Sequence, residues 1–277
     1  MPFRKGMGHN FLFGMEITGY LFSIGIGIIL GLLGGGGSIL SIPILVYFFH
    51  IDAVLASAYS LFIVGVTSLI GAVPKYKDHL VSIKAGLLFG IPSILSIFIT
   101  RKWLVPAIPD IIFQTNSMVL TKRFLVLGLF ALLMIVTSIT MIAGQKEKVR
   151  TEHEPRLALA VFEGILIGFL TGLVGAGGGF LIIPALVVLT GLPFKTAVGT
   201  SLFVIAINAL TGFLGDVINY HMNWPFLLLL TSLATAGIFI GNRLTHKISG
   251  FKLRRSFGWF VLAVGVWIFF RETFVAI

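Results

Sequence analysis

The chain of 277 residues lacks cysteine and is poor in charge, with only 10 acidic residues and 11% charged residues in all. Without cysteine there can be no disulfide scaffold, thiol nucleophile or thiolate metal site. A soluble domain carries about 25% charged residues, so the composition excludes an ordinary soluble enzyme. The chain instead has 57% hydrophobic residues and a mean hydropathy of +1.06. This composition indicates an all-α, multi-pass membrane protein.

The net charge of +10 comes from 20 lysines and arginines, which lie almost entirely between the apolar runs. In those places they anchor helix ends and set the orientation of the chain in the membrane. This distribution argues against nucleic acid as a partner. The composition predicts the lipid bilayer as the partner, and nothing in the sequence indicates an oligomeric state.

Eight apolar runs are long enough to cross a bilayer, which takes about 20 helical residues. They lie at 15–33, 53–73, 82–100, 123–143, 157–175, 194–214, 224–242 and 256–274. Two shorter runs, Ile39–His50 and Phe180–Leu192, each follow a glycine cluster and contain a proline. Such short, interrupted segments are typical of the discontinuous helices of transporters.

Residues 101–123 interrupt this pattern. They contain Pro106, Pro109, Asp110, Gln114 and Asn116 within an otherwise apolar stretch. We therefore expect an irregular or surface-lying excursion there rather than a span. Asp216 follows the 194–214 run, and we expect it to be an exposed loop residue.

An internal repeat appears when the chain is compared with itself at an offset of 141. Residues 31–71 and 172–212 align without a gap and are identical at 16 of 41 positions. The matches include Gly34, Gly36, Gly37, Pro43 and Ser60 over Gly175, Gly177, Gly178, Pro184 and Ser201, which apolar bias alone does not explain. The sequence therefore predicts a duplicated transporter, with repeats at 1–143 and 157–277 joined by a hydrophilic cytoplasmic linker at 144–156.

The number of segments in each half determines how the repeats are related, because an odd number inverts the second half. Five per half, with the amino terminus outside, places 13 lysines and arginines inside and 7 outside, whereas four per half divides them 10 and 10. The positive-inside rule favours inverted repeats of five plus five segments, each with one short broken helix after a glycine-rich hairpin. The exceptions, which this arrangement places outside, are Arg101, Lys102, Lys122 and Arg123.

The two glycine-rich hairpins are the predicted substrate site. Glycine allows positive φ and close approach of a ligand, and the amino terminus of the following helix attracts an anion. Inverted repeats can bring both helix termini together near the bilayer midplane. The alternative is helix packing, as in the GxxxG pairs Gly27/Gly31 and Gly168/Gly172, but four adjacent glycines exceed what packing requires. The predicted substrate-binding residues are Gly34, Gly35, Gly36, Gly37, Ser38, Ser60, Gly175, Gly177, Gly178, Gly179, Thr200, Ser201 and Asn208.

Two alternatives remain for the polar residues. Any single hydroxyl in the predicted site can instead hydrogen-bond to its own helix. Glu163 is either a proton-coupling site, which would add protons to the partners, or a snorkelling interfacial group. The chain has no HExxH, no paired membrane aspartates and no Walker motif, so we expect no catalytic residues, metal or cofactor, and a protein that is not an enzyme.

The pattern Gly-x-Gly-Gly-[Gly/Ser]-x-Leu-x-x-Pro occurs twice, at Gly34–Pro43 and Gly175–Pro184, each time followed by Ser-Leu-Phe at 60–62 and 201–203. With these motifs the chain resembles the TauE/SafE family of sulfite exporters over essentially its whole length. The resemblance implies a secondary permease of the bacterial or archaeal inner membrane for a small anion, such as sulfite or an organosulfonate. The competing hypothesis is a non-transporting scaffold or assembly subunit of a larger complex.

Overall fold

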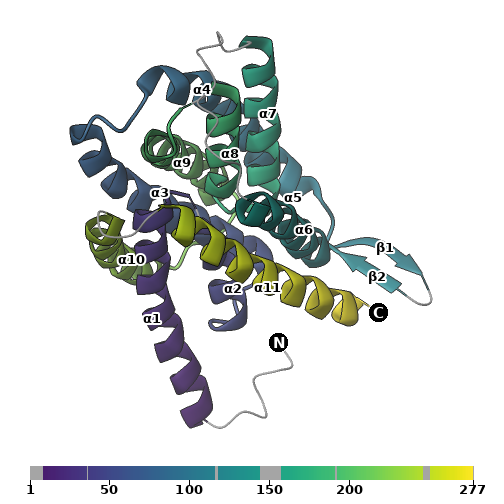
Figure 1. The fold of residues 1–277 in the computed structure, drawn as a ribbon. Helices are drawn as coiled ribbons and strands as arrows, with labels where there is room; N and C mark the ends of the chain where they lie inside the picture. The colour runs from purple at the N-terminus through teal and green to yellow at the C-terminus, as the bar shows by residue number, and fades with distance from the viewer. Residues whose placement is uncertain are drawn as a thin grey trace.

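The computed structural model describes residues 9–35, 37–115, 118–143, 157–190, 192–245 and 250–276. All eight long apolar runs form helices (Figure 1). They are α1 (His9–Leu33), α3 (Ala53–Lys77), α4 (Ile83–Ile99), α6 (Lys122–Ala143), α7 (Leu157–Val174), α9 (Phe194–Val217), α10 (Trp224–Thr245) and α11 (Gly250–Ala276). The short helices α2 (Ser38–Tyr47) and α8 (Gly179–Thr190) follow the glycine clusters.

Length and composition agree with a multi-pass membrane protein. Within the described residues, five helical segments are long and apolar enough to cross a membrane. They are Ala53–Lys77, Ile83–Ala107, Lys122–Ala143, Lys195–Val217 and Trp224–Leu244. Helix α2 has 10 residues and therefore rises about 15 Å, half of the roughly 30 Å hydrocarbon core. It cannot cross the bilayer on its own.

Equivalent helices of the two halves make equivalent contacts. Helix α1 packs on α10, and α7, which occupies the repeat position of α1, packs on α4. A β-carbon added at Gly27 would overlap the backbone of Ala234, and one added at Gly168 would overlap the backbone of Ser93. Gly168 and Ala234 lie 141 positions after Gly27 and Ser93. The register of the repeat therefore extends into α4 and α10, and these GxxxG glycines serve helix packing.

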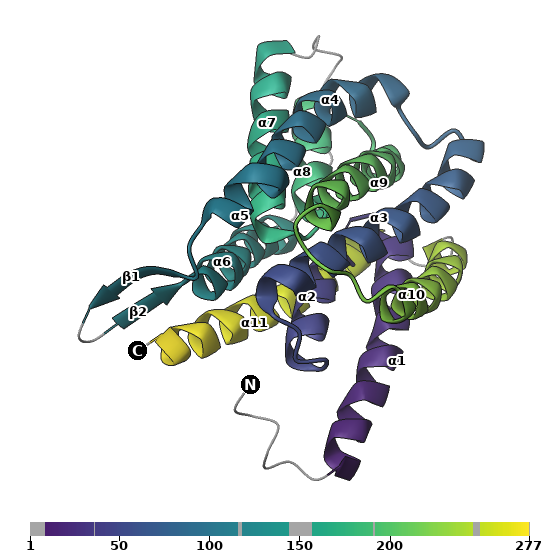
Figure 2. The ribbon, with the colours of Figure 1, turned by 180° about the vertical axis from the view of Figure 1, so that it is seen from behind.

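Helices α3 and α9 occupy the same position in their repeats and pack on each other (Figures 1 and 2). They run in opposite directions. Leu61, near the start of α3, lies beside Gly212 near the end of α9, whereas Lys75, near the end of α3, lies beside Gly199 near the start of α9. A rotation that superimposes the first half on the second must therefore reverse the direction of the central helix, so that α3 takes the direction of α9.

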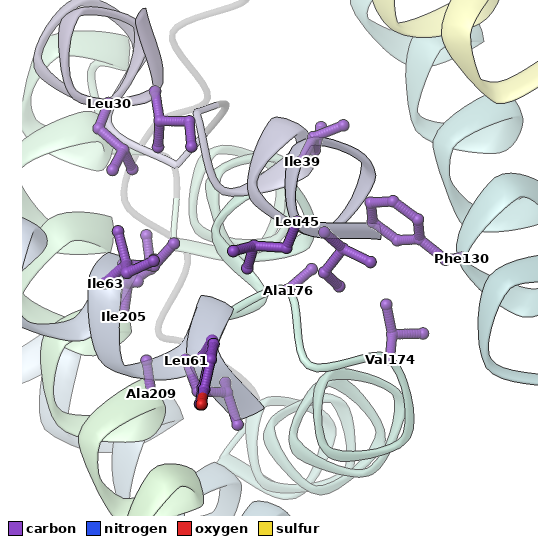
Figure 3. Packing of buried hydrophobic residues seen from close by; sticks show 14 of the residues in the cluster. Leu30, Ile39, Leu45, Leu61, Ile63, Phe130, Val174, Ala176, Ile205 and Ala209 are labelled. Atoms are coloured by element: carbon purple, nitrogen blue, oxygen red, sulfur yellow. The ribbon is translucent and has the colours of Figure 1, made fainter. Parts of the chain in front are cut away.

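The core joins the two halves rather than lying within either. Leu45 of α2 and Leu61 of α3 gather with Ala176 and with Ile205 of α9 in one cluster (Figure 3). Each of these four side chains is at most 1% exposed. Because Ala176 lies within the second glycine cluster, this packing fixes the turn that leads into α8.

Residues 101–123 are only partly the surface excursion that the prolines predicted. Helix α4 continues through a π-helical turn (Thr100–Leu104) into the short α5 (Val105–Ala107), so the prediction is wrong at Arg101, which is buried. Beyond α5, strands β1 (Ile111–Thr115) and β2 (Met118–Thr121) form an antiparallel hairpin that projects beside the end of α11 (Figure 2). The apolar side chains of β1, Ile111, Ile112 and Phe113, are exposed, as expected for a surface-lying segment.

Candidate functional site

The two glycine turns meet where α2 and α8 begin. A β-carbon added at Gly35 would overlap the backbone of Gly179, and one added at Gly179 would overlap Gly35. Gly179 is the first residue of α8, and Gly35 lies three residues before the start of α2. The structure therefore places in direct contact two turns that the sequence predicted to converge.

Backbone conformation and packing account for most of the predicted glycines. Positive φ angles occur at Gly34 (76°), Gly175 (82°), Gly177 (67°) and Gly178 (71°). Gly37 has a φ of −66°, but a β-carbon there would overlap the backbone carbonyl of Ile26. Gly36 lies outside the described residues. Close backbone contacts alone therefore require glycine at Gly35, Gly37 and Gly179, whether or not a ligand binds. At these three positions the structure does not support the expectation that the clusters contain more glycine than packing requires.

Two of the predicted serines bond to nearby backbone. Ser38 donates to the carbonyl of Gly35 at 2.7 Å, and Ser201 donates to the carbonyl of Val198 at 2.7 Å. Both serines therefore fit the alternative interpretation, in which the hydroxyl hydrogen-bonds to a backbone carbonyl close by in the chain. Ser60 differs, because its Oγ is buried and has no hydrogen-bond partner among the described residues.

Thr200 and Asn208 tie α9 to α4. Thr200 Oγ1 accepts a hydrogen bond from the backbone N–H of Ser82 at 2.9 Å, just before α4 begins. Asn208 Nδ2 donates to Ser93 Oγ at 2.5 Å, while its buried Oδ1 has no partner within the described chain. Thr200 therefore stabilises the start of α4, whereas the side-chain oxygen of Asn208 has an unused hydrogen-bond acceptor in the described part of the chain.

Glu163 lies half-buried on α7, beside the exposed side chains of Phe162 and Leu166. Neither of the ion pairs found in the described part of the chain includes it. The proton-coupling role of Glu163 stays a prediction.

A buried arginine adjoins the second glycine turn. The side chain of Arg101 is 0% exposed, and its Nη1 donates to Asp216 Oδ2 at 3.1 Å and to Ser57 Oγ at 2.8 Å. Its Nε and Nη2 have no hydrogen-bond partner among the described residues. A β-carbon added at Gly175 would overlap Nη2, so this nitrogen lies directly against the turn. The turn therefore has a positive charge and two unused donors beside it.

The prediction that Asp216 is an exposed loop residue is wrong. It is fully buried, because α9 continues to Val217 and the charge of Arg101 compensates its own. Local apolar content could not reveal this pair, since its members lie 115 residues apart. The repeat does carry a signal for this pair. At an offset of 141, Arg101 matches Asn242 and Asp216 matches Lys75, so polar residues occupy both positions in both halves.

The two glycine turns differ in their polar surroundings. Thr171 Oγ1 is buried without a partner in the described chain and lies against Gly178. At the corresponding place in the first half, Leu30 lies against Gly37. The second turn therefore has an arginine and a hydroxyl beside it, whereas the residues that match these two at the repeat offset are Asn242, an amide, and Leu30, an aliphatic residue.

A family model described as "Sulfite exporter TauE/SafE" matches residues 20–268. The chain belongs to the TauE/SafE family. A probable membrane transporter protein of Xylella fastidiosa is 30% identical over 93% of this chain and 98% of its own length. Similar proteins of Bacillus subtilis and Methanocaldococcus jannaschii, also named probable membrane transporters, are each 28% identical, over 78% and 83% of this chain and 84% and 87% of their own lengths. No solved structure matches it. These findings confirm the family that the duplicated motif predicted.

Proposed function

We propose that this TauE/SafE protein is a secondary transporter for a small anion, sulfite or an organosulfonate, in the inner membrane. The contact between the glycine turns, from which α2 and α8 begin, carries the proposal. Helix amino termini attract anions, and they do so more strongly where water is excluded. The family's description and the names of the relatives support transport rather than catalysis.

A flux assay tests this function. The purified protein is reconstituted into liposomes, and uptake of sulfite, thiosulfate, sulfoacetate and chloride is compared with uptake by protein-free liposomes. We expect saturable flux of at least one sulfur oxyanion and little flux of chloride. A protein that inserts and folds yet moves none of the four would favour the scaffold hypothesis and contradict the transporter.

We also propose that the two repeats are inverted, five segments against five. The opposite directions of α3 and α9 support this arrangement, because equivalent spans of parallel repeats would run the same way. The distribution of lysine and arginine, 13 inside against 7 outside, supports it independently.

Insertion of a reporter at Asp78 and at Asn219 tests the inversion, because these positions are separated by the repeat offset of 141. Each residue follows the end of its central helix, α3 or α9. Inverted repeats predict that the reporter at Asp78 is cytoplasmic, as is one fused after Gly144, and that the reporter at Asn219 is outside. A topology assay that places Asp78 and Asn219 on the same side would contradict the inversion.

A further inference from the structure

We propose that Arg101 is the anion-binding residue of this protein and that it selects oxyanions, such as sulfite and sulfonates, over halides. This inference rests on the proposed anion transport and names the group that recognises the substrate. Three features carry it: the two unused donors of the guanidinium, its fixed orientation, and its place against a glycine turn.

The two unused donors form one edge of the guanidinium. Nε–H and Nη2–H point in parallel from the same side of this planar group, so they match two oxygens of one oxyanion. Chloride is a single atom, so both donors would have to bend toward the same acceptor, which weakens each hydrogen bond. Nη1 is held by Asp216 and Ser57, which fix the plane of the group and leave Nη2, one end of the free edge, against Gly175. The edge is therefore arranged for an oxyanion before the substrate arrives.

The charge balance at this place suits binding followed by release. Arg101 and Asp216 together are neutral, so no full net positive charge is buried there to hold an anion irreversibly. A bound oxyanion would be stabilised by the Nε and Nη2 hydrogen bonds, by the hydroxyl of Thr171 and by the amino terminus of α8. Each of these interactions is one that water can replace.

The second turn fits this role better than the first. Gly175, Gly177 and Gly178 all have positive φ, whereas Gly37, the counterpart of Gly178, has a negative one. Arg101 and Thr171 have no repeat counterparts of the same chemistry, because Asn242 and Leu30 occupy the matching positions. We therefore place the oxyanion at the Gly175–Gly179 turn rather than midway between the two turns.

The substitution Arg101→Lys tests the fork directly. Lysine keeps the positive charge that Asp216 requires but offers one rotating donor group instead of a planar edge. In calorimetric titrations of the detergent-solubilised protein with sulfite, we expect binding to weaken by about tenfold to a hundredfold. The preference for sulfite over chloride should fall with it. The matched control is Arg243→Lys, at an exposed position in the last turn of α10, which should change neither value.

A second variant keeps the test decisive if Arg101→Lys does not fold. Thr171→Val preserves side-chain shape and removes only the unpaired hydroxyl, so sulfite binding should weaken by about twofold to tenfold. Folded Arg101→Lys protein with unchanged sulfite affinity and preference would overturn the inference while leaving transport intact. Chloride binding by the wild type as tight as that of sulfite and methanesulfonate would also overturn it. If the wild type neither binds nor transports any of these anions, both the proposed function and this inference are wrong.

Discussion

Replacing Asp216 with alanine should lower the free energy of unfolding by about 3–5 kcal/mol, the cost of leaving a buried charge without its partner. Arg101 has no exposed surface through which water could replace the lost carboxylate. The loss should appear as a lower melting temperature of the purified protein in detergent. It is the largest stability effect that we expect from a single substitution in this chain.

Two comparisons separate this charge effect from a simple loss of packing. Glu272→Ala removes the buried partner of Arg123, whose side chain is 42% exposed, so it should cost clearly less than Asp216→Ala. The double substitution Arg101→Met with Asp216→Leu removes both charges and should recover most of the lost stability. If Asp216→Ala costs no more than Glu272→Ala, or the double variant is the least stable of all, the account of the buried pair is wrong.

The substitution Gly175→Ala should weaken sulfite binding by about tenfold to a hundredfold, because a β-carbon there would displace the Arg101 Nη2 that we propose as a ligand. It should also cost about 1–3 kcal/mol of stability, since φ at this position is 82° and alanine is strained in that conformation. Both quantities can be measured on the same preparation, by calorimetric titration and by thermal unfolding.

Gly34→Ala is the matched control for this prediction. Its φ is 76°, and its β-carbon would crowd Val198 and Ser201 rather than an arginine. We expect a similar loss of stability with unchanged sulfite affinity in the folded protein. Equal losses of affinity in both variants would show that the first turn also binds the anion, and unchanged affinity in both would reduce the turns to packing devices.

The arrangement of helices was largely predictable from local sequence. Apolar runs of about 20 residues have few alternatives to a helix in a bilayer, because lipid offers no hydrogen bonds to an open backbone. The duplicated motif added the register of the halves, and the glycine and proline pattern located the short helices α2 and α8. All of these signals depend on neighbouring residues or on direct comparison of the two halves.

The polar partners were not predictable in the same way. Arg101 lies among prolines, and Asp216 lies just beyond an apolar run, so each looks like an interfacial residue until α4 and α9 are packed together. Thr200 likewise lies within an apolar run of α9, and only the fold shows that Ser82 uses its hydroxyl. Pairs this distant in sequence depend on tertiary contacts, which hydropathy and spacing do not report.

The most direct test of the account is to locate a bound oxyanion. Selenite has the shape and charge of sulfite and contains a strong anomalous scatterer, so crystals grown with it would reveal its position. We predict one peak beside Gly175, with selenite oxygens about 2.7–3.2 Å from Nε and Nη2 of Arg101. A peak beside Gly34 and Asn242, or binding only at the protein surface, would contradict the assignment of the second glycine turn as the anion site.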